Sequence, residues 1–122
     1  MALIAIIDDD PDILDASRLI LNSKEFQTIT ADNPEDGYRI VKEYSPDLII
    51  LDVQDDGFSL AQRFRKEGIK IPILMYSSVS QTTGLEYGKS ELAPVDEYVE
   101  KPISPEELLE KVERLLCLHH EE

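Results

Sequence analysis

The sequence predicts one α/β domain in which a parallel five-stranded sheet carries helices on both faces. Short apolar runs alternate along the chain with segments of helical periodicity, which is typical of strand-helix-strand units. Residues 3–7 and 48–51 are nearly continuous runs of aliphatic residues, as expected of strands buried on both faces. The length of 122 residues fits a single domain that is large enough to bury a core.

The five expected strands differ in polarity, and this difference predicts their places in the sheet. Residues 3–7, 48–51 and 71–76 are the most apolar runs and belong at the centre. Residues 26–31 and 95–99 are more polar, which suits the two edges. We expect the doubly wound strand order 2-1-3-4-5, in which the first and third strands are neighbours.

Capping signals mark where the helices begin. Asp10 and Asn33 are each followed by proline, the arrangement of an N-cap residue before the first helical turn. Ser104 and Glu107 have the spacing of a capping box. The apolar stripe that follows the box consists of Leu108, Leu109, Val112, Leu115 and Leu116.

Two further helices are expected from weaker patterns. Residues 58–67 have helical periodicity that stops at Gly68, and residues 80–91 contain two glycines and form the least regular helical segment. The polar tail from residue 118 is expected to fray. No repeat or linker divides the chain, so residues 1–122 are interpreted as one domain.

Composition excludes several classes of function. The 12 Lys and Arg against 26 Asp and Glu give a net charge of −14, which disfavours contact with nucleic acid or anionic membranes. The apolar stretch 1–7 is far shorter than the roughly 20 residues of a membrane span, and no basic residue precedes it as in a signal peptide. The single cysteine, Cys117, allows no internal disulfide and predicts a cytoplasmic protein.

Polar residues end four of the five expected strands. Asp8 and Asp9 follow the first, Asp52 ends the third, Ser77 ends the fourth, and Lys101 follows the fifth. Ligands of open α/β sheets bind at the carboxyl ends of the strands. We therefore expect three carboxylates, one hydroxyl and one ammonium group to converge there.

Three close carboxylates require a compensating charge, because two like charges about 4 Å apart repel by roughly 4 kcal/mol at an effective dielectric constant near 20. A divalent cation together with Lys101 would balance Asp8, Asp9 and Asp52. A ligand set made only of oxygen favours Mg²⁺, or Mn²⁺, over zinc. The alternative is that Asp8 and Asp9 only cap the helix and compensate its dipole, roles that Asp10 and Asp12 can fill without them.

Four short motifs occur in order along almost the whole chain: IIDDDPDIL at residues 6–14, PDLIILD at 46–52, IPILMYSS at 71–78 and DEYVEKP at 96–102. Each motif alone is common. Together they resemble the receiver domains of bacterial two-component response regulators, which have a flavodoxin-like fold.

The resemblance implies a phosphorylation site at Asp52. This residue matches the aspartate that accepts a phosphoryl group from a phosphohistidine on a sensor histidine kinase or a phosphotransfer protein. Asp8 and Asp9 match the acidic pair that holds Mg²⁺, one directly and the other partly through water. Gln54 matches the position whose main-chain carbonyl binds the metal.

The resemblance also implies a conformational switch. Lys101 matches the lysine that contacts the phosphorylated aspartate, and its bond to Pro102 is typically cis in the family; the alternative is an exposed lysine before a turn proline. Ser77 matches the switch hydroxyl and Tyr98 the aromatic that moves with it; the alternatives are a strand-end serine and an edge-strand tyrosine.

The output of that switch is expected to be a protein-binding surface formed by residues 71–76, 80–91 and 95–99. We expect a stand-alone receiver without a DNA-binding domain and without enzymatic activity beyond its own phosphorylation and dephosphorylation. Its partners would be the kinase or phosphotransfer protein and a downstream protein target, with no nucleic acid and no membrane.

The chain departs from the family pattern after Asp52. In receivers, the segment from this aspartate through a Gly-Phe pair usually contains ten residues. The corresponding segment here, residues 52–58, contains seven residues and includes Asp55 and Asp56. A degenerate receiver that binds partners without phosphate is therefore an alternative.

Two other classes of protein are alternatives to the receiver. A Mg²⁺-dependent phosphohydrolase that forms an aspartyl phosphate would need a second acid near Gln54 to protonate the leaving group, and a cap that covers the substrate. A flavodoxin-like cofactor binder would need a Gly-rich loop after Ile7, where acids stand instead.

Overall fold

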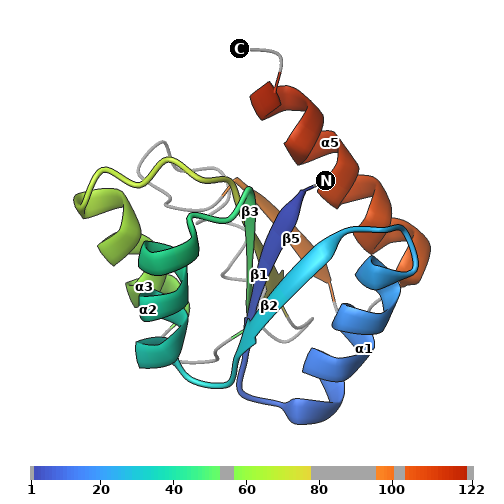
Figure 1. The fold of residues 1–122 in the computed structure, drawn as a ribbon, viewed down its shortest axis with the longest axis horizontal. Coiled ribbons are helices and arrows are strands. Elements are labelled where there is room, and N and C mark those ends of the chain that lie inside the picture. The colour runs from blue at the N-terminus through green and yellow to red at the C-terminus, as the bar shows by residue number, and fades with distance from the viewer. Residues whose placement is uncertain (1, 53–56, 78–95, 101–103, 121–122) are drawn as a thin grey trace.

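A computed structural model describes residues 2–52, 57–77, 96–100 and 104–120. A five-stranded parallel sheet in the order β2-β1-β3-β4-β5 forms its centre, which confirms the predicted fold class and strand order (Figure 1). The strands are β1 (Leu3–Asp8), β2 (Gln27–Ala31), β3 (Leu48–Asp52), β4 (Ile73–Ser77) and β5 (Glu97–Glu100). The helices are α1 (Pro11–Asn22), α2 (Pro34–Tyr44), α3 (Gly57–Lys66) and α5 (Pro105–His120).

The sheet separates two apolar layers. Helices α1 and α5 cover one face, and α2 and α3 cover the other (Figure 1). Because side chains alternate along a strand, Ile4 and Ile6 of β1 pack under α1 and α5, whereas Ala5 and Ile7 pack under α2 and α3. The aliphatic residues of β3 are fully buried, as those of β1 are from Ile4 onward, so both strands have the double-sided burial that their sequences predict.

The predicted helix starts are confirmed by their caps. The Asp10 carboxylate accepts a hydrogen bond from the Asp12 amide at 3.0 Å, and the Asn33 side chain accepts one from the Asp36 amide at 2.8 Å. At the start of α5 the Ser104 hydroxyl accepts one from the Glu107 amide at 3.4 Å. These caps fix where each helix leaves the edge of the sheet.

Strand β4 begins at Ile73, two residues later than predicted, and an arginine of α3 contacts the segment before it. Nη1 of Arg65 donates hydrogen bonds of 2.9 Å to the carbonyls of Ile69 and Ile71. Nη2 of Arg65 donates to Asp96 just before β5. Arg65 thus ties the approaches to β4 and β5 together.

Helix α5 continues through residues 118–120 to His120, because no glycine or proline interrupts it. The expectation that the tail from residue 118 frays stays a prediction. The helix predicted at residues 80–91 lies outside the described residues. Among the helices that the structure describes, none combines the length and the apolar character needed to cross a membrane.

Gly37 allows α2 to approach β1 closely, and Gly37→Ala should destabilise the fold. A Cβ atom at this position would lie 2.7 Å from Cδ1 of the fully buried Ile7. Overpacking of this kind costs about 1–3 kcal/mol, which outweighs the roughly 1 kcal/mol that alanine gains in a helix. Urea unfolding should show a lower free energy of unfolding. The loss should shrink in an Ile7→Ala background, which lacks Cδ1, Cγ1 and Cγ2, the three side-chain carbons that lie closest to the added Cβ; an equal loss in both backgrounds would contradict the packing explanation.

Candidate functional site

Three polar side chains stand in one row across neighbouring strands at the carboxyl edge of the sheet. Asp8 at the end of β1 is in register with Asp52 at the end of β3. Leu51 is in register with Met75, so Asp52 and Tyr76 follow one position further along β3 and β4. Register partners of parallel strands point to the same face about 5 Å apart, which places Asp8, Asp52 and Tyr76 side by side under α1 and α5.

Two of these side chains are buried carboxylates. Asp8 is 0% exposed and Asp52 is 6% exposed. Oδ1 of Asp8 accepts a hydrogen bond of 2.8 Å from the Asp10 amide, which ties this carboxylate to the start of α1. Asp10, and not Asp8, caps the helix through its own bond with the Asp12 amide. The capping role that was the alternative for Asp8 is therefore filled by another residue.

Asp9 is placed differently from the other two carboxylates, because it follows β1 and is exposed to solvent. Among the described residues, no three Asp, Glu, His or Cys side chains gather closely enough to hold a metal ion. The structure thus brings Asp8 and Asp52 together and leaves Asp9 at the rim. Two buried carboxylates with a third at the rim are hard oxygen donors, which fits Mg²⁺ or Mn²⁺ better than a softer metal.

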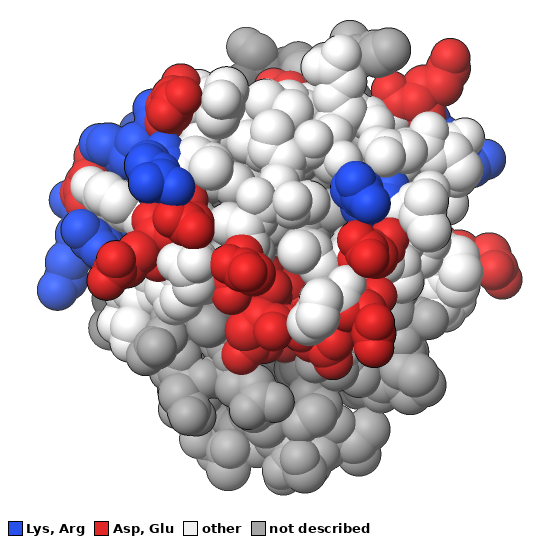
Figure 2. Space-filling view, turned by 60° about the horizontal axis from the view of Figure 1, so that its bottom comes forward, with Lys and Arg blue, Asp and Glu red and all other residues white. Residues whose placement is uncertain are grey.

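Acidic side chains also gather around the buried pair. Figure 2 looks toward the edge where the strands end and shows a continuous group of acidic side chains there. Exposed acids of the segments that leave β1 and β2 at this edge include Asp9, Asp10, Asp12, Asp32 and Glu35. Such a field attracts cations and repels phosphate groups that approach without one.

Tyr76, the third member of the row, forms a buried hydroxyl pair with a serine of α1. The Tyr76 hydroxyl lies 2.8 Å from Oγ of Ser17, which is fully buried on α1. Burial raises the pKa of the Tyr76 phenol well above its ordinary range; the hydrogen bond with Ser17 opposes this shift, and the charges of Asp8 and Asp52 add to it. The two carboxylates therefore lie near enough to act on the phenol.

The remaining predicted site residues are only partly placed. Ser77 ends β4 in register with Glu100, and Tyr98 of β5 is in register with Met75, so both lie on the two strands expected to form the switch. Gln54 and Lys101 lie outside the described residues, as does Pro102. The chemical roles of these residues stay predictions.

Sequence reasoning missed Ser17 and Tyr76 as neighbours of the site. A signal was present, because position 17 falls on the same helical stripe as Ile13 and Leu21, where a serine interrupts an apolar pattern. Tyr76 likewise interrupts an apolar strand. Only the tertiary structure shows that the two hydroxyls meet.

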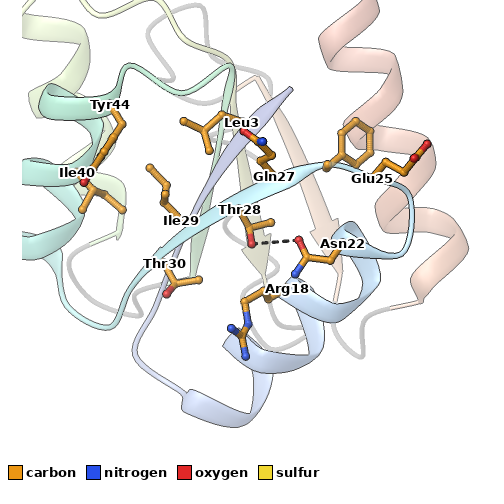
Figure 3. Close-up of a pocket in the computed structure, with 11 residues that line it drawn as sticks. Leu3, Arg18, Asn22, Glu25, Gln27, Thr28, Ile29, Thr30, Ile40 and Tyr44 are labelled. Atoms are coloured by element: carbon orange, nitrogen blue, oxygen red, sulfur yellow. Dashed lines mark hydrogen bonds between the residues drawn. The ribbon is translucent and has the colours of Figure 1, made fainter. Parts of the chain in front are cut away.

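An open hollow lies elsewhere, along the free edge of β2. Its lining includes Arg18 and Asn22 of α1, Thr28 and Thr30 of β2, and Tyr44 of α2 (Figure 3). The Thr28 hydroxyl donates a hydrogen bond of 3.3 Å to the side-chain oxygen of Asn22. None of the residues that line this hollow is one of the buried carboxylates, so it does not belong to the site at the strand ends.

Comparison with known proteins agrees with this geometry. Residues 4–113 match the model of a family described as the response regulator receiver domain. A protein of Cyanidium caldarium named "Probable transcriptional regulator ycf27" is 36% identical over 118 residues, which are 91% of this chain and 45% of that protein. The "DNA-binding dual master transcriptional regulator RpaA" of Synechocystis is 35% identical over 121 residues, which are 95% of this chain and 49% of that protein.

Solved structures show the same fold. A putative response regulator from Chloroflexus aurantiacus has a TM-score of 0.83 at 27% identity, with 95% of this chain and 98% of that chain covered. A CheY-like receiver domain protein from Methanospirillum hungatei has a TM-score of 0.88 at 24% identity, with 99% and 98% covered. This chain therefore spans nearly the full length of these solved chains but about half the length of the curated relatives.

The burial of Tyr76 predicts a stability difference at alkaline pH. Because the phenol pKa is higher in the folded than in the unfolded chain, the unfolded chain loses its proton first as the pH rises above about 10. Between pH 9 and 11 the free energy of unfolding should then fall by about 1.4 kcal/mol more in the parent than in Tyr76→Phe. Urea unfolding between pH 9 and 11 measures this difference, and parallel slopes for the two proteins would refute the assignment.

Proposed function

Because this chain belongs to the response regulator receiver family, we propose that its Asp52 carboxylate accepts a phosphoryl group from a phosphohistidine of a sensor histidine kinase or phosphotransfer protein. The observation that carries the proposal is the position of Asp52. It is a buried acid at the end of a central aliphatic strand, in register with a second buried acid, Asp8. Ligands of open parallel sheets bind at that edge.

In the proposed reaction, a carboxylate oxygen of Asp52 attacks the phosphorus atom of the donor. The P–N bond of the phosphohistidine breaks, its electron pair returns to the imidazole nitrogen, and an acyl phosphate forms on Asp52. The chain contributes mainly by orienting the nucleophile, since β3 holds Asp52 at a fixed place in the register of the sheet.

A hard divalent cation, Mg²⁺ or Mn²⁺, is part of the proposal. Asp8 would hold it together with Asp52, Asp9 would hold it partly through water, and the main chain of Gln54 would add a carbonyl. When bound, the cation supplies positive charge for the phosphoryl oxygens. The chemistry of the described donors, two buried carboxylates and a third at the rim, supports this assignment.

Lys101, Ser77 and Tyr98 carry the remaining proposed roles. The Lys101 ammonium stabilises the added phosphoryl group, the Ser77 hydroxyl moves toward it, and the Tyr98 ring follows. The surface formed by β4, residues 80–91 and β5 would then bind a downstream protein. The register that places Ser77 and Tyr98 on adjacent strands supports the pairing of the two switch residues.

For this chain, which spans about half the length of its curated relatives, the proposed partners are proteins and not nucleic acid. The net charge of −14 and the acidic edge favour basic protein surfaces. A degenerate receiver that binds its partner without phosphate is the second candidate. The observation that favours it is the shortened segment 52–58, with Asp55 and Asp56 next to a group that must receive phosphate.

Incubation with Mg²⁺ and acetyl phosphate should add one phosphoryl group, about 80 Da, to the protein. Intact mass spectrometry measures the adduct, and Asp52→Asn should abolish it. Asp47→Asn provides a matched control, because Asp47 precedes the same strand but is exposed. An unmodified parent protein, beside a labelled control receiver, would favour the degenerate receiver.

Mg²⁺ alone should stabilise the fold if Asp8 helps to hold it. At about ten times its dissociation constant, a ligand bound only by the folded state adds about 1.4 kcal/mol to the free energy of unfolding. Urea unfolding should show this gain in the parent and in the control Glu113→Gln, which removes an exposed acid of α5. The gain should be lost in Asp8→Asn. An equal gain in all three proteins would place the cation elsewhere.

A further inference from the structure

Strand β2 is an edge of the described sheet, and its outer main-chain groups face the hollow beside it. Gln27 donates its main-chain N–H to the carbonyl of Ala2, so the main chains of Gln27 and Ile29 face β1. The intervening residues of a parallel strand turn their main-chain groups the other way. The N–H and C=O groups of Thr28 and Thr30 therefore point outward, where they can pair with another strand.

The two edges of the sheet differ in how well they are protected against such pairing. Strand β5 carries Glu97 and Glu100, and charged side chains discourage the pairing of edge strands. Strand β2 has the sequence QTITA, which contains neither a charge nor a proline. Tyr44 lines the hollow beside β2 and is 52% exposed. An unprotected edge beside an exposed aromatic side chain indicates a binding surface.

The charged side chains of the hollow lie at opposite ends of β2 (Figure 3). Asn22 of α1 is bonded to Thr28, and Arg18 lies one helical turn away, toward the carboxyl end of the strand. Glu25 lies just before the strand begins. The ion pair of Arg18 with Asp15, at 3.3 Å, lies on the exposed surface of α1 and holds the arginine only weakly.

We propose that β2 is a contact between two copies of this chain, which pair in antiparallel direction about a two-fold axis at Ile29. In this register Thr28 of each copy faces Thr30 of the other, and their outward main-chain groups exchange hydrogen bonds in both directions. The two Ile29 side chains meet on the face that α2 covers, beside Tyr44. The two sheets become one continuous sheet.

Charge favours a second copy as the partner and antiparallel as the direction. The two-fold axis exchanges the ends of β2, so Arg18 of each copy approaches Glu25 of the other. It also places the two acidic carboxyl edges at opposite ends of the joined sheet. Parallel pairing would bring these edges side by side, and with a net charge of −14 on each copy they would repel each other.

The first test is sedimentation equilibrium of the 122-residue chain, which should show a reversible dimer of twice its 13.9 kDa mass. A five-residue strand forms a small interface, so we expect a weak dimer with a dissociation constant below about 1 mM. Thr30→Pro should abolish the dimer, because proline lacks the outward N–H and is tolerated in an edge strand. Thr30→Val keeps this N–H and should dimerise like the parent.

The second test reverses charges across the proposed contact. Arg18→Glu alone and Glu25→Arg alone should each raise the dissociation constant about tenfold, because both copies of the contact change from attraction to repulsion. An equimolar mixture of the two variants should regain the parent affinity, since each reversed charge then faces an opposite charge. Arg39→Glu reverses an exposed charge of α2 outside the hollow and should have a much smaller effect.

The outcomes decide the proposal independently of phosphorylation at Asp52, which takes no part in either test. A parent that stays monomeric at about 1 mM overturns it and leaves the edge to a different partner. A dimer that all these substitutions leave unchanged uses another surface, which also overturns it. Should Thr30→Pro not fold, the charge variants decide, and a mixture as weak as either variant alone would refute the antiparallel contact.

Discussion

The candidate site depends on one constraint that the fold imposes: two carboxylates are held side by side, out of solvent, at the ends of adjacent strands. Asp8 and Asp52 occupy the same level of the register, and repulsion between like charges so placed is worth a few kcal/mol at an effective dielectric constant near 20. The strands that carry them contain seven fully buried isoleucines and leucines, each contributing about 1.5–3 kcal/mol by burial as an upper estimate. The aliphatic rows therefore hold the carboxylates in place, and the carboxylates do not determine the fold.

The three consecutive acids Asp8, Asp9 and Asp10, before the start of α1, have different structural roles. Asp8 lies in the buried row and accepts the Asp10 amide, Asp9 is exposed at the rim, and Asp10 caps the helix through the Asp12 amide. Strand alternation and the change from strand to helix separate them within three residues. In the proposed function this division matters electrostatically. The acidic edge draws a cation in before a phosphoryl donor, because phosphate is repelled until the edge is partly neutralised.

Helix α1 connects this edge to the interior of the domain. Its N-terminus is fixed against Asp8, and Ser17 reaches the Tyr76 hydroxyl within the layer that α1 shares with α5. A buried hydroxyl pair between a helix and a strand is directional, whereas the surrounding contacts of Leu21, Leu74 and Leu108 are not. The relative position of α1 and β4 is thus specified more narrowly than apolar packing alone would specify it.

The sequence by itself determined the α/β class, the central and edge strands and the capped helix starts, because these follow from local patterns of burial and capping that occupy a few adjacent residues. It also indicated that Asp8 and Asp52 end neighbouring strands, since the carboxyl ends of parallel strands meet at one edge. Tertiary structure alone decided that Asp8 is buried in register with Asp52 while Asp9 is exposed, and that Ser17 meets Tyr76 from 59 residues away. Those contacts depend on the register of the strands and on how the Tyr76 side chain of β4 reaches α1, and no local pattern in the chain encodes either.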